Sequence, residues 1–511
     1  MKKNLKGLLI YPPVQLMEQE RPRPDGSLGL IYLASSLKQK GIETDVLDAS
    51  VGGYEHNLKN TFYRYVKQEN GLIRIGMNFE EIADYVKKGN YNFVGINSNL
   101  TPQTKMAFET ARAIKQENSQ IKIFAGGVSA RALTDRFLST GYFDAICLTE
   151  GEIIFPKAII EGVENTSGFS YIDKNGKKKI NPVDETCFPR KLDDLPLPSW
   201  EKLPLDKYEQ ISAPHGLDVS GKSNYRYAPI MTSRGCVWHC SYCHISTEKK
   251  DIGKLRTHSI ERVVWEMDKL KSLRIEKIFF EDDTLLSKKD RAKEIFKRAK
   301  EKNFSIANVN GVNLINFYDN KWDIDMEYLE ILKDAGYNQI VFPVESGSQR
   351  ILDKYASGKV KLEKMNLPLL MKKMTNLGIK SPVNMIIGFP DETENEIQQS
   401  INLGKELIQS GAPYVSFFVP IPFPGSKLYD IAIQENYLDK HFDTDLMNWK
   451  RPIMKNTLIP PKRLEEIRDQ ANETVNEKEF IQEACAKTIG NQWKVQRINL
   501  EDTIGNQINK K

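Results

Sequence analysis

Short apolar runs alternate with amphipathic stretches over residues 1–155. An apolar run at 8–11 precedes a helical pattern over 28–38, which Gly41 ends, and a strand is expected to follow at 43–47. The same alternation continues with strands expected at 93–97, 121–125 and 144–148 and a helix over 102–116. This strand, helix, strand order predicts a doubly wound, Rossmann-like parallel sheet.

The alternation breaks between residues 156 and 227. Asn175-Gly176 predicts the turn of a hairpin, and the proline-rich stretch LDDLPLPSWEKLPLDKY is typical of a connector that lies over a surface. We therefore interpret 156–227 as a linker that contains a hairpin.

Strand and helix patterns alternate again over residues 228–430. Helices are expected at 259–273, with Ser259 as N-cap, and at 288–302. The pattern predicts six strands, at 230–233, 277–281, 305–309, 339–344, 383–387 and 414–419. Six such units predict a partial (β/α)6 TIM-like barrel, whose reactive groups lie at the carboxyl ends of the strands.

The last segment, 431–511, has a helical pattern rich in lysine and glutamate. Leu464, Ile467, Ala471 and Val475 fall on one face of a helix. This spacing predicts a helical C-terminal cap packed on the barrel.

Charge and hydropathy limit which binding partners and which cellular location we expect. The 73 basic and 68 acidic residues give a net charge of +5 and are spread along the chain, so nucleic acid is not indicated. No apolar run is long enough to insert into a membrane, and the run at 8–11 is too short for a signal peptide. We expect a cytoplasmic protein.

The cysteines indicate a metal site instead of a disulfide framework. Cys236, Cys240 and Cys243 lie within eight positions, directly after an expected strand, while the other three of the six cysteines are scattered singly. Three thiolates at this spacing can hold three corners of a [4Fe-4S] cluster and leave the fourth iron open. The alternative is a zinc site completed by His239 or His244.

The segment RGCVWHCSYCHIS resembles the signature of the radical S-adenosylmethionine (SAM) superfamily. The resemblance implies that SAM binds the open iron and that its reductive cleavage yields a 5'-deoxyadenosyl radical. It also implies that Tyr242 packs near the adenine of SAM, and that an external electron donor such as flavodoxin or ferredoxin reduces the cluster.

The ends of later expected strands resemble the SAM-binding segments of the same family. Glu281 and Asp282 stand where the family binds the methionine ammonium, although an acidic run at a strand end can also be a solvated helix cap. The other implied contacts are Glu345 and Ser346 to the ribose, Asn384 and Gly388 of NMIIGFPDE to the adenine, and Asn313 as a further polar contact. Asn384 and Asp391 depart from the family pattern, which has glycine and glutamate there.

The N-terminal segments LLIYPP, IFAGGVSA and LTEGE resemble the cobalamin-binding domain of one large subgroup of these enzymes. Gly126, Gly127 and Ser129 are then expected to approach the corrin ring. The DxHxxG motif that supplies an imidazole to cobalt elsewhere is absent, and many members of the subgroup hold cobalamin without it. A sheet domain that has lost its cofactor is the alternative.

Together the two resemblances imply a class B radical SAM methyltransferase that methylates an unactivated carbon of a small-molecule substrate. One alternative is a radical SAM oxidoreductase or cyclase without methyl transfer. Another is a non-catalytic iron-sulfur or zinc binding protein.

Overall fold

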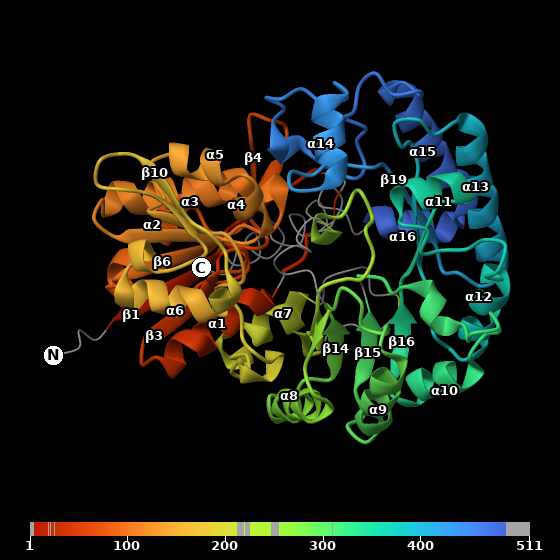
Figure 1. Cartoon of the computed structure of the whole chain (residues 1–511), viewed down its shortest axis with the longest axis horizontal. Coiled ribbons are helices and arrows are strands. Elements are labelled where there is room, and N and C mark those ends of the chain that lie inside the picture. The colour runs from red at the N-terminus through yellow and green to blue at the C-terminus, as the bar shows by residue number, and fades with distance from the viewer. Residues whose placement is uncertain are drawn as a thin grey trace, which may run out of the picture.

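A seven-stranded sheet forms the centre of the N-terminal part of the chain, on the left of Figure 1. The computed structural model describes residues 5–18, 20, 22–24, 26–211, 219, 225–246, 255–308 and 310–486. The parallel strands are β1 (Lys6–Tyr11), β3 (Glu43–Asp48), β6 (Phe93–Asn97), β7 (Lys122–Gly126) and β8 (Ala145–Cys147). The sheet order β10-β9-β8-β7-β6-β1-β3 confirms the predicted doubly wound arrangement.

Helices cover both faces of this sheet. Leu8 and Ile10 of β1 belong to one hydrophobic core and Leu9 belongs to another, so alternate residues of the strand pack on opposite faces. The helices are α1 (Leu28–Gln39), α2 (Phe79–Gly89), α3 (Thr104–Glu117), α4 (Val128–Ala132), α5 (Thr134–Ser139) and α6 (Gly151–Glu161). Helix α1 packs against α6 and α2 against α3.

The hairpin predicted around Asn175-Gly176 is present, and it extends the sheet. Strands β9 (Phe169–Ile172) and β10 (Lys178–Asn181) pair antiparallel, with Gly176 at φ +72° in the turn, and β9 pairs with β8. A small antiparallel sheet of β2 (Val14–Leu16), β4 (Tyr65–Lys67) and β5 (Ile73–Ile75) was not predicted. Its strands are three residues long, too short to give an alternating pattern.

The connector after the hairpin is packed against both halves of the molecule. The fully buried Trp200 donates its indole N–H to the carbonyl of Pro229 at 2.9 Å. Helix α7 (Leu205–Ile211) carries Lys207, whose ammonium donates to the carbonyls of residues 51, 52 and 53. These contacts join the connector to the first barrel strand and to the loop after β3.

Parallel strands form an open barrel on the right of Figure 1. They are β11 (Tyr227–Ile230), β14 (Lys277–Phe280), β15 (Ser305–Asn308), β16 (Tyr337–Ile340), β17 (Phe342–Glu345), β18 (Val383–Ile386) and β19 (Val415–Phe418). The strand predicted at 339–344 is divided, because Ile340 N–H bonds to Lys380 while Val341 N–H bonds back to Asn308. The barrel thus consists of a four-stranded and a three-stranded sheet, joined by a bridge between Gln339 and Lys380.

The barrel helices follow the predicted alternation. Ser259 caps the first of them, because its hydroxyl accepts the N–H of Arg262 at 3.1 Å. They are α8 (Ile260–Ser272), α9 (Lys289–Lys300), α10 (Met326–Asp334), α11 (Gln349–Tyr355), α12 (Leu367–Asn376), α13 (Glu394–Gln409) and α14 (Lys427–Gln434). A two-residue ladder of β12 (Ser233–Arg234) and β13 (Arg256–Thr257) follows β11.

Helices α15 (Pro461–Val475) and α16 (Lys478–Ala486) form the C-terminal cap. The four apolar residues predicted to share a face of α15 are all buried, and α15 packs on β19 and α13. The rest of the predicted helical segment, 487–511, lies outside the described residues. Within the ranges described here, no helix is both long enough and apolar enough to cross a membrane.

Candidate functional site

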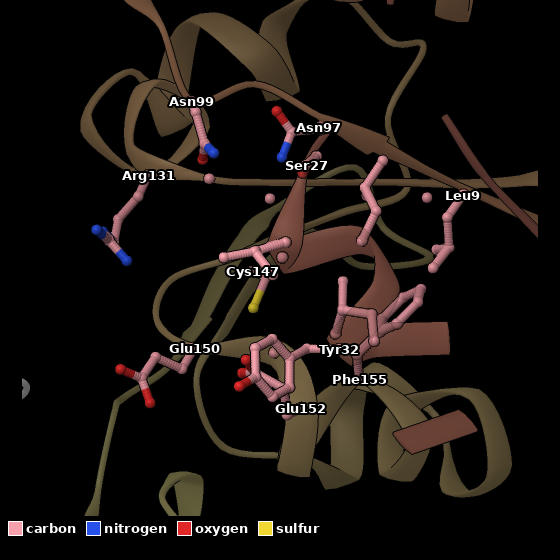
Figure 2. Close-up of a pocket in the computed structure, with 18 of the residues that line it drawn as sticks. Leu9, Ser27, Tyr32, Asn97, Asn99, Arg131, Cys147, Glu150, Glu152 and Phe155 are labelled. Atoms are coloured by element: carbon pink, nitrogen blue, oxygen red, sulfur yellow. The ribbon is translucent and has the colours of Figure 1, made fainter. Parts of the chain in front are cut away.

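A cavity of about 420 Å³ lies where the carboxyl edge of the N-terminal sheet meets the mouth of the barrel. Figure 2 shows residues that line it, among them Asn97 at the end of β6, Asn99 just after this strand, and Cys147 at the end of β8. The barrel contributes Glu281 and Asp283, and the cysteine loop contributes His244. Both halves of the molecule therefore present their ligand-binding ends to one space.

Gly126 and Gly127 line the side of this cavity that the N-terminal sheet forms. A Cβ atom on Gly126 would meet only the Cβ of Cys147, at 3.7 Å, so Gly126 leaves room for a ligand. Gly127 has φ +105°, and a Cβ there would lie 2.7 Å from the carbonyl oxygen of Ser98. Ser129, grouped with them from the sequence, is fully buried in α4, with its hydroxyl 2.9 Å from that of Thr104. Gly126 and Gly127 thus line the cavity, whereas Ser129 does not, and the expected contacts of all three with the corrin stay predictions.

The loop with the three cysteines is held by hydrogen bonds to three separate parts of the barrel. They are Gly235 N–H to Asp283 (2.9 Å), His239 N–H to Ser357 (3.1 Å), Ser241 N–H to the carbonyl of Tyr355 (2.8 Å) and Leu428 N–H to the carbonyl of Ser241 (2.7 Å). The loop is therefore fixed between the end of β14, the end of α11 and the start of α14.

Cys236, Cys240 and Cys243 influence one another's ionisation. Burial raises the pKa of all three thiols, that of Cys243 to about 12, and the charges of Cys236 and Cys240 contribute to the rise for Cys243. The thiolates of Cys236 and Cys240 would repel that of Cys243, and bound iron would compensate this negative charge. This set of three sulfur donors fits a [4Fe-4S] cluster with one open iron.

A zinc site is not supported. Among the residues that the structure describes, no three His, Cys, Asp or Glu side chains are arranged to hold a single metal ion. A four-iron cluster needs wider spacing of its sulfur ligands than one tetrahedral ion does. His239 is exposed, and His244 faces the cavity.

A buried ion pair lies beside the cysteine loop. Glu345 ends β17, and its carboxylate lies 2.8 Å from the ammonium of Lys359, with both side chains at most 10% exposed. Burial, with the charge of Glu345 as a further cause, holds the pKa of the Tyr242 hydroxyl well above its usual value. Glu345 has φ +69°, a left-handed conformation that is costly for a residue with a side chain and that is found mainly at functional sites. Lys359 was not predicted.

The three acidic residues after β14 lie in two different environments. Asp282 is 1% exposed, and its carboxylate accepts hydrogen bonds from the N–H of Thr232 (3.0 Å) and the hydroxyls of Thr232 (2.8 Å) and Ser233 (2.5 Å). Glu281 and Asp283 line the cavity instead. Of the two residues assigned to SAM from the sequence, Glu281 faces the cavity, and Asp282 ties β14 to the segment after β11.

Replacing Asp282 by asparagine is expected to lower the free energy of unfolding by about 2 kcal/mol, because an amide group would face three donors. Chemical denaturation measures the change. Glu276→Gln, an exposed position before the same strand, is the matched control and leaves the free energy of unfolding unchanged. Equal stability of the two variants would contradict the buried role of Asp282.

The other residues assigned to SAM lie within the later strands or in the segments after them, and their contacts to SAM stay predictions. Ser346 is fully buried, with its hydroxyl 3.2 Å from that of Ser400. Asn313 is 7% exposed before a short helical turn, and Asn384 is half-buried within β18. Gly388 has φ +93° and faces Leu464 of the cap, so a side chain there would displace α15.

Glu392 is a buried acid that sequence reasoning missed. It is fully buried, and one carboxylate oxygen accepts the N–H groups of Gly388 (2.6 Å) and Phe389 (3.1 Å). The second oxygen has no hydrogen-bond partner in the described part of the chain, and burial raises the pKa to about 8. The neighbouring Asp391 is half-buried and pairs with Arg350 at 2.7 Å.

The elevated pKa of Glu392 predicts a pH-dependent stability. Between its ordinary pKa of 4.5 and about 8 the folded chain binds one more proton than the unfolded chain, so raising the pH through this window lowers the free energy of unfolding. Urea denaturation at several pH values, compared with Glu392→Gln, isolates this contribution. The wild type is expected to lose stability relative to the variant from about pH 5 to about pH 8. Parallel profiles of stability against pH in the two proteins would contradict this contribution of Glu392.

Known protein families and structures resemble the chain over most of its length. The sequence profile of the Radical SAM superfamily matches residues 230–404, and that of the B12 binding domain matches residues 26–159. An uncharacterized methyltransferase of Pyrococcus horikoshii is 30% identical over 467 residues, which cover 89% of this chain and 88% of the relative.

Two further proteins extend the comparison. Cytidylyl-2-hydroxyethylphosphonate methyltransferase of Streptomyces wedmorensis is 28% identical over 479 residues, with 88% of this chain and 85% of the relative covered. The radical SAM methyltransferase TsrM of Kitasatospora setae, solved with cobalamin and a [4Fe-4S] cluster, superposes with a TM-score of 0.58 at 16% identity. That superposition covers 84% of this chain and 75% of TsrM, and it shows a shared fold.

Proposed function

Because this chain belongs to the radical SAM superfamily and carries a B12-binding domain, we propose that it is a cobalamin-dependent methyltransferase acting on an unactivated carbon of a small molecule. The observation that carries the proposal is the shared cavity. Gly126 and Gly127 border it from the sheet, and the cysteine loop borders it from the barrel. A cofactor held on the glycines would face the cysteine loop across the cavity.

The chain's own residues fit both cofactors. Cys236, Cys240 and Cys243 would hold the cluster, and the glycine edge of the sheet would hold cobalamin. When bound, the cluster with SAM supplies a 5'-deoxyadenosyl radical that abstracts hydrogen, and cobalamin supplies the methyl group.

The remaining side chains bind, orient and exclude water. Glu281 faces the cavity with a carboxylate suited to an ammonium group, while Glu345 and Lys359 offer opposite charges beside the cysteine loop. The ring of Tyr242, 5.9 Å from that of Phe389, provides an apolar surface for a base. This enclosure protects a radical from solvent.

The methyltransferase relatives disfavour the alternative functions. Two relatives that cover most of this chain are named methyltransferases, which disfavours an oxidoreductase or cyclase without methyl transfer. The same likeness and the two-sided cavity disfavour a binding protein without turnover. An external reductant such as flavodoxin or ferredoxin is required by the chemistry, and we place the enzyme in the reducing cytoplasm, where cysteine ligands stay free.

Anaerobic reconstitution tests the proposal. Full-length protein supplied with iron, sulfide and hydroxocobalamin is expected to retain about four irons and one cobalamin per chain. With SAM and reductant it is expected to release 5'-deoxyadenosine. A chain that binds iron but no cobalamin, or that releases no 5'-deoxyadenosine, would contradict the proposed function. Cytidylyl-2-hydroxyethylphosphonate, named for the Streptomyces relative, is the first substrate to try.

A further inference from the structure

A buried group of charged side chains joins the N-terminal domain to the cysteine loop. Arg234, in β12, stands two residues before Cys236 and is 12% exposed. Its guanidinium contacts Glu150 at 3.1 Å and Glu152 at 2.6 Å. Both glutamates follow β8 of the N-terminal sheet, so one arginine of the barrel is held by two carboxylates of the other domain.

A second arginine strengthens this junction. Arg256 of β13 pairs directly with Arg234 in the two-residue ladder and donates to Glu150 at 3.0 Å. The ring of Tyr32, from α1, lies beneath the guanidinium of Arg234 at 5.1 Å. Glu150 therefore bridges two adjacent arginines, and removal of either partner would leave buried charge uncompensated.

This group, which we call the arginine clamp (Arg234, Arg256, Glu150, Glu152 and Tyr32), forms a wall of the cavity. Figure 2 shows Tyr32, Glu150 and Glu152 at the edge of the cavity on the side of α1 and α6, and Arg234 lines it as well. The clamp thus spans from the sheet that carries Gly126 to the loop that carries the cysteines.

The clamp also acts on the cysteine loop itself. Gly235, the residue after Arg234, donates its N–H to Asp283 at 2.9 Å, and its carbonyl accepts the hydroxyl of Thr284 at 2.9 Å. The backbone just before Cys236 is therefore fixed on one side by the end of β14 and on the other by the two glutamates. Arg234 therefore connects the start of the loop to the N-terminal sheet.

We propose that Arg234 is a positioning residue that sets the separation between the glycine edge of the sheet and the cysteine loop, an inference that rests on the proposed function. Held by Glu150 and Glu152, it keeps the two sides of the cavity at the distance at which a corrin bound on the sheet faces the cluster. Loss of the clamp lets the sides separate. Cobalamin then binds more weakly and methyl transfer is uncoupled from SAM cleavage, while the three cysteines still hold iron.

The test compares variants in the reconstituted, full-length protein. Arg234→Met removes the clamp, and Arg234→Lys keeps a charge without the two-pronged geometry. Arg226→Met is the matched control. Arg226 is 16% exposed, also contacts two carboxylates (Asp206 and Glu209), and lies before β11 at the opposite end of the barrel from the cavity.

Three measurements are made on each protein: affinity for hydroxocobalamin by absorbance, iron per chain, and the ratio of S-adenosylhomocysteine to 5'-deoxyadenosine. Arg234→Met is expected to weaken cobalamin binding by about tenfold or more and to lower the product ratio, with wild-type iron content. Arg234→Lys is expected to recover part of the cobalamin affinity and part of the product ratio. Arg226→Met is expected to match the wild type in all three measurements.

Wild-type cobalamin affinity and product ratio in Arg234→Met would overturn the inference, as would loss of iron in parallel with cobalamin, since that would indicate disruption of the loop itself. Glu152→Gln gives a second, milder break of the same contact and is expected to change affinity in the same direction. Failure of the wild type to bind hydroxocobalamin would contradict the proposed function and is seen separately, before any variant is compared.

Discussion

The triple variant Cys236→Ala/Cys240→Ala/Cys243→Ala is expected to bind no iron and to release no 5'-deoxyadenosine. These cysteines supply the three sulfur ligands that fit a cluster with one open iron, and they lie on one loop that hydrogen bonds fix to the barrel. Iron and sulfide analysis after anaerobic reconstitution, with the visible absorption spectrum, measures the loss. Any single alanine among the three is expected to have the same effect.

Cys187→Ala is the matched control for this prediction. Cys187 is equally a free cysteine, but it is fully buried at the end of a short helical turn in the connector after the hairpin. Its replacement is expected to leave iron content and 5'-deoxyadenosine release at wild-type values. Retention of a four-iron cluster by the triple variant would show that the ligands lie elsewhere.

Gly126→Leu is expected to weaken cobalamin binding by about a hundredfold, or ~3 kcal/mol, and to leave the cluster intact. Gly126 has no left-handed backbone angle, and a Cβ there has open space before it, so a leucine folds without strain and occupies the cavity. Titration with hydroxocobalamin measures the affinity, and iron analysis reports the cluster.

Lys122→Leu, on the same strand β7 but at its exposed start, adds the same side chain away from the cavity. It is expected to bind cobalamin as the wild type does. Unchanged affinity in Gly126→Leu would place cobalamin outside this cavity.

Apolar periodicity was enough to predict both halves of the molecule. Inner parallel strands of the N-terminal sheet, such as β1 and β6, are buried on both faces, so they appear as short continuous apolar runs. The cap at Ser259 followed from capping preference and the apolar face of α15 from helical periodicity. Apolar periodicity did not predict the division of the strand around Val341. Its pairing changes sides between one residue and the next, which leaves hydrophobicity unaltered.

The acidic run shows why site residues are harder to predict. Strand β14 ends at Phe280, and beyond it alternate residues continue to face opposite sides. Glu281 and Asp283 therefore face the cavity, and Asp282 faces Thr232 and Ser233. Composition alone cannot show which of three adjacent acidic residues face the cavity.

Lys359, Glu392 and Arg234 were missed for a different reason. Each is a buried charged group whose partner lies far away in the sequence or is a backbone N–H, as Glu345, Gly388 and Glu152 show. Charged residues are usually exposed, and only tertiary packing reveals the exceptions. Local sequence patterns carry no signal of such pairs.

The central claim is that one cavity brings SAM cleavage and cobalamin-dependent methyl transfer together. The most direct measurement incubates reconstituted protein anaerobically with SAM and reductant, with and without hydroxocobalamin, and quantifies both SAM products. We predict 5'-deoxyadenosine under both conditions and S-adenosylhomocysteine only when cobalamin is present. Release of 5'-deoxyadenosine with no cobalamin-dependent S-adenosylhomocysteine would contradict the account.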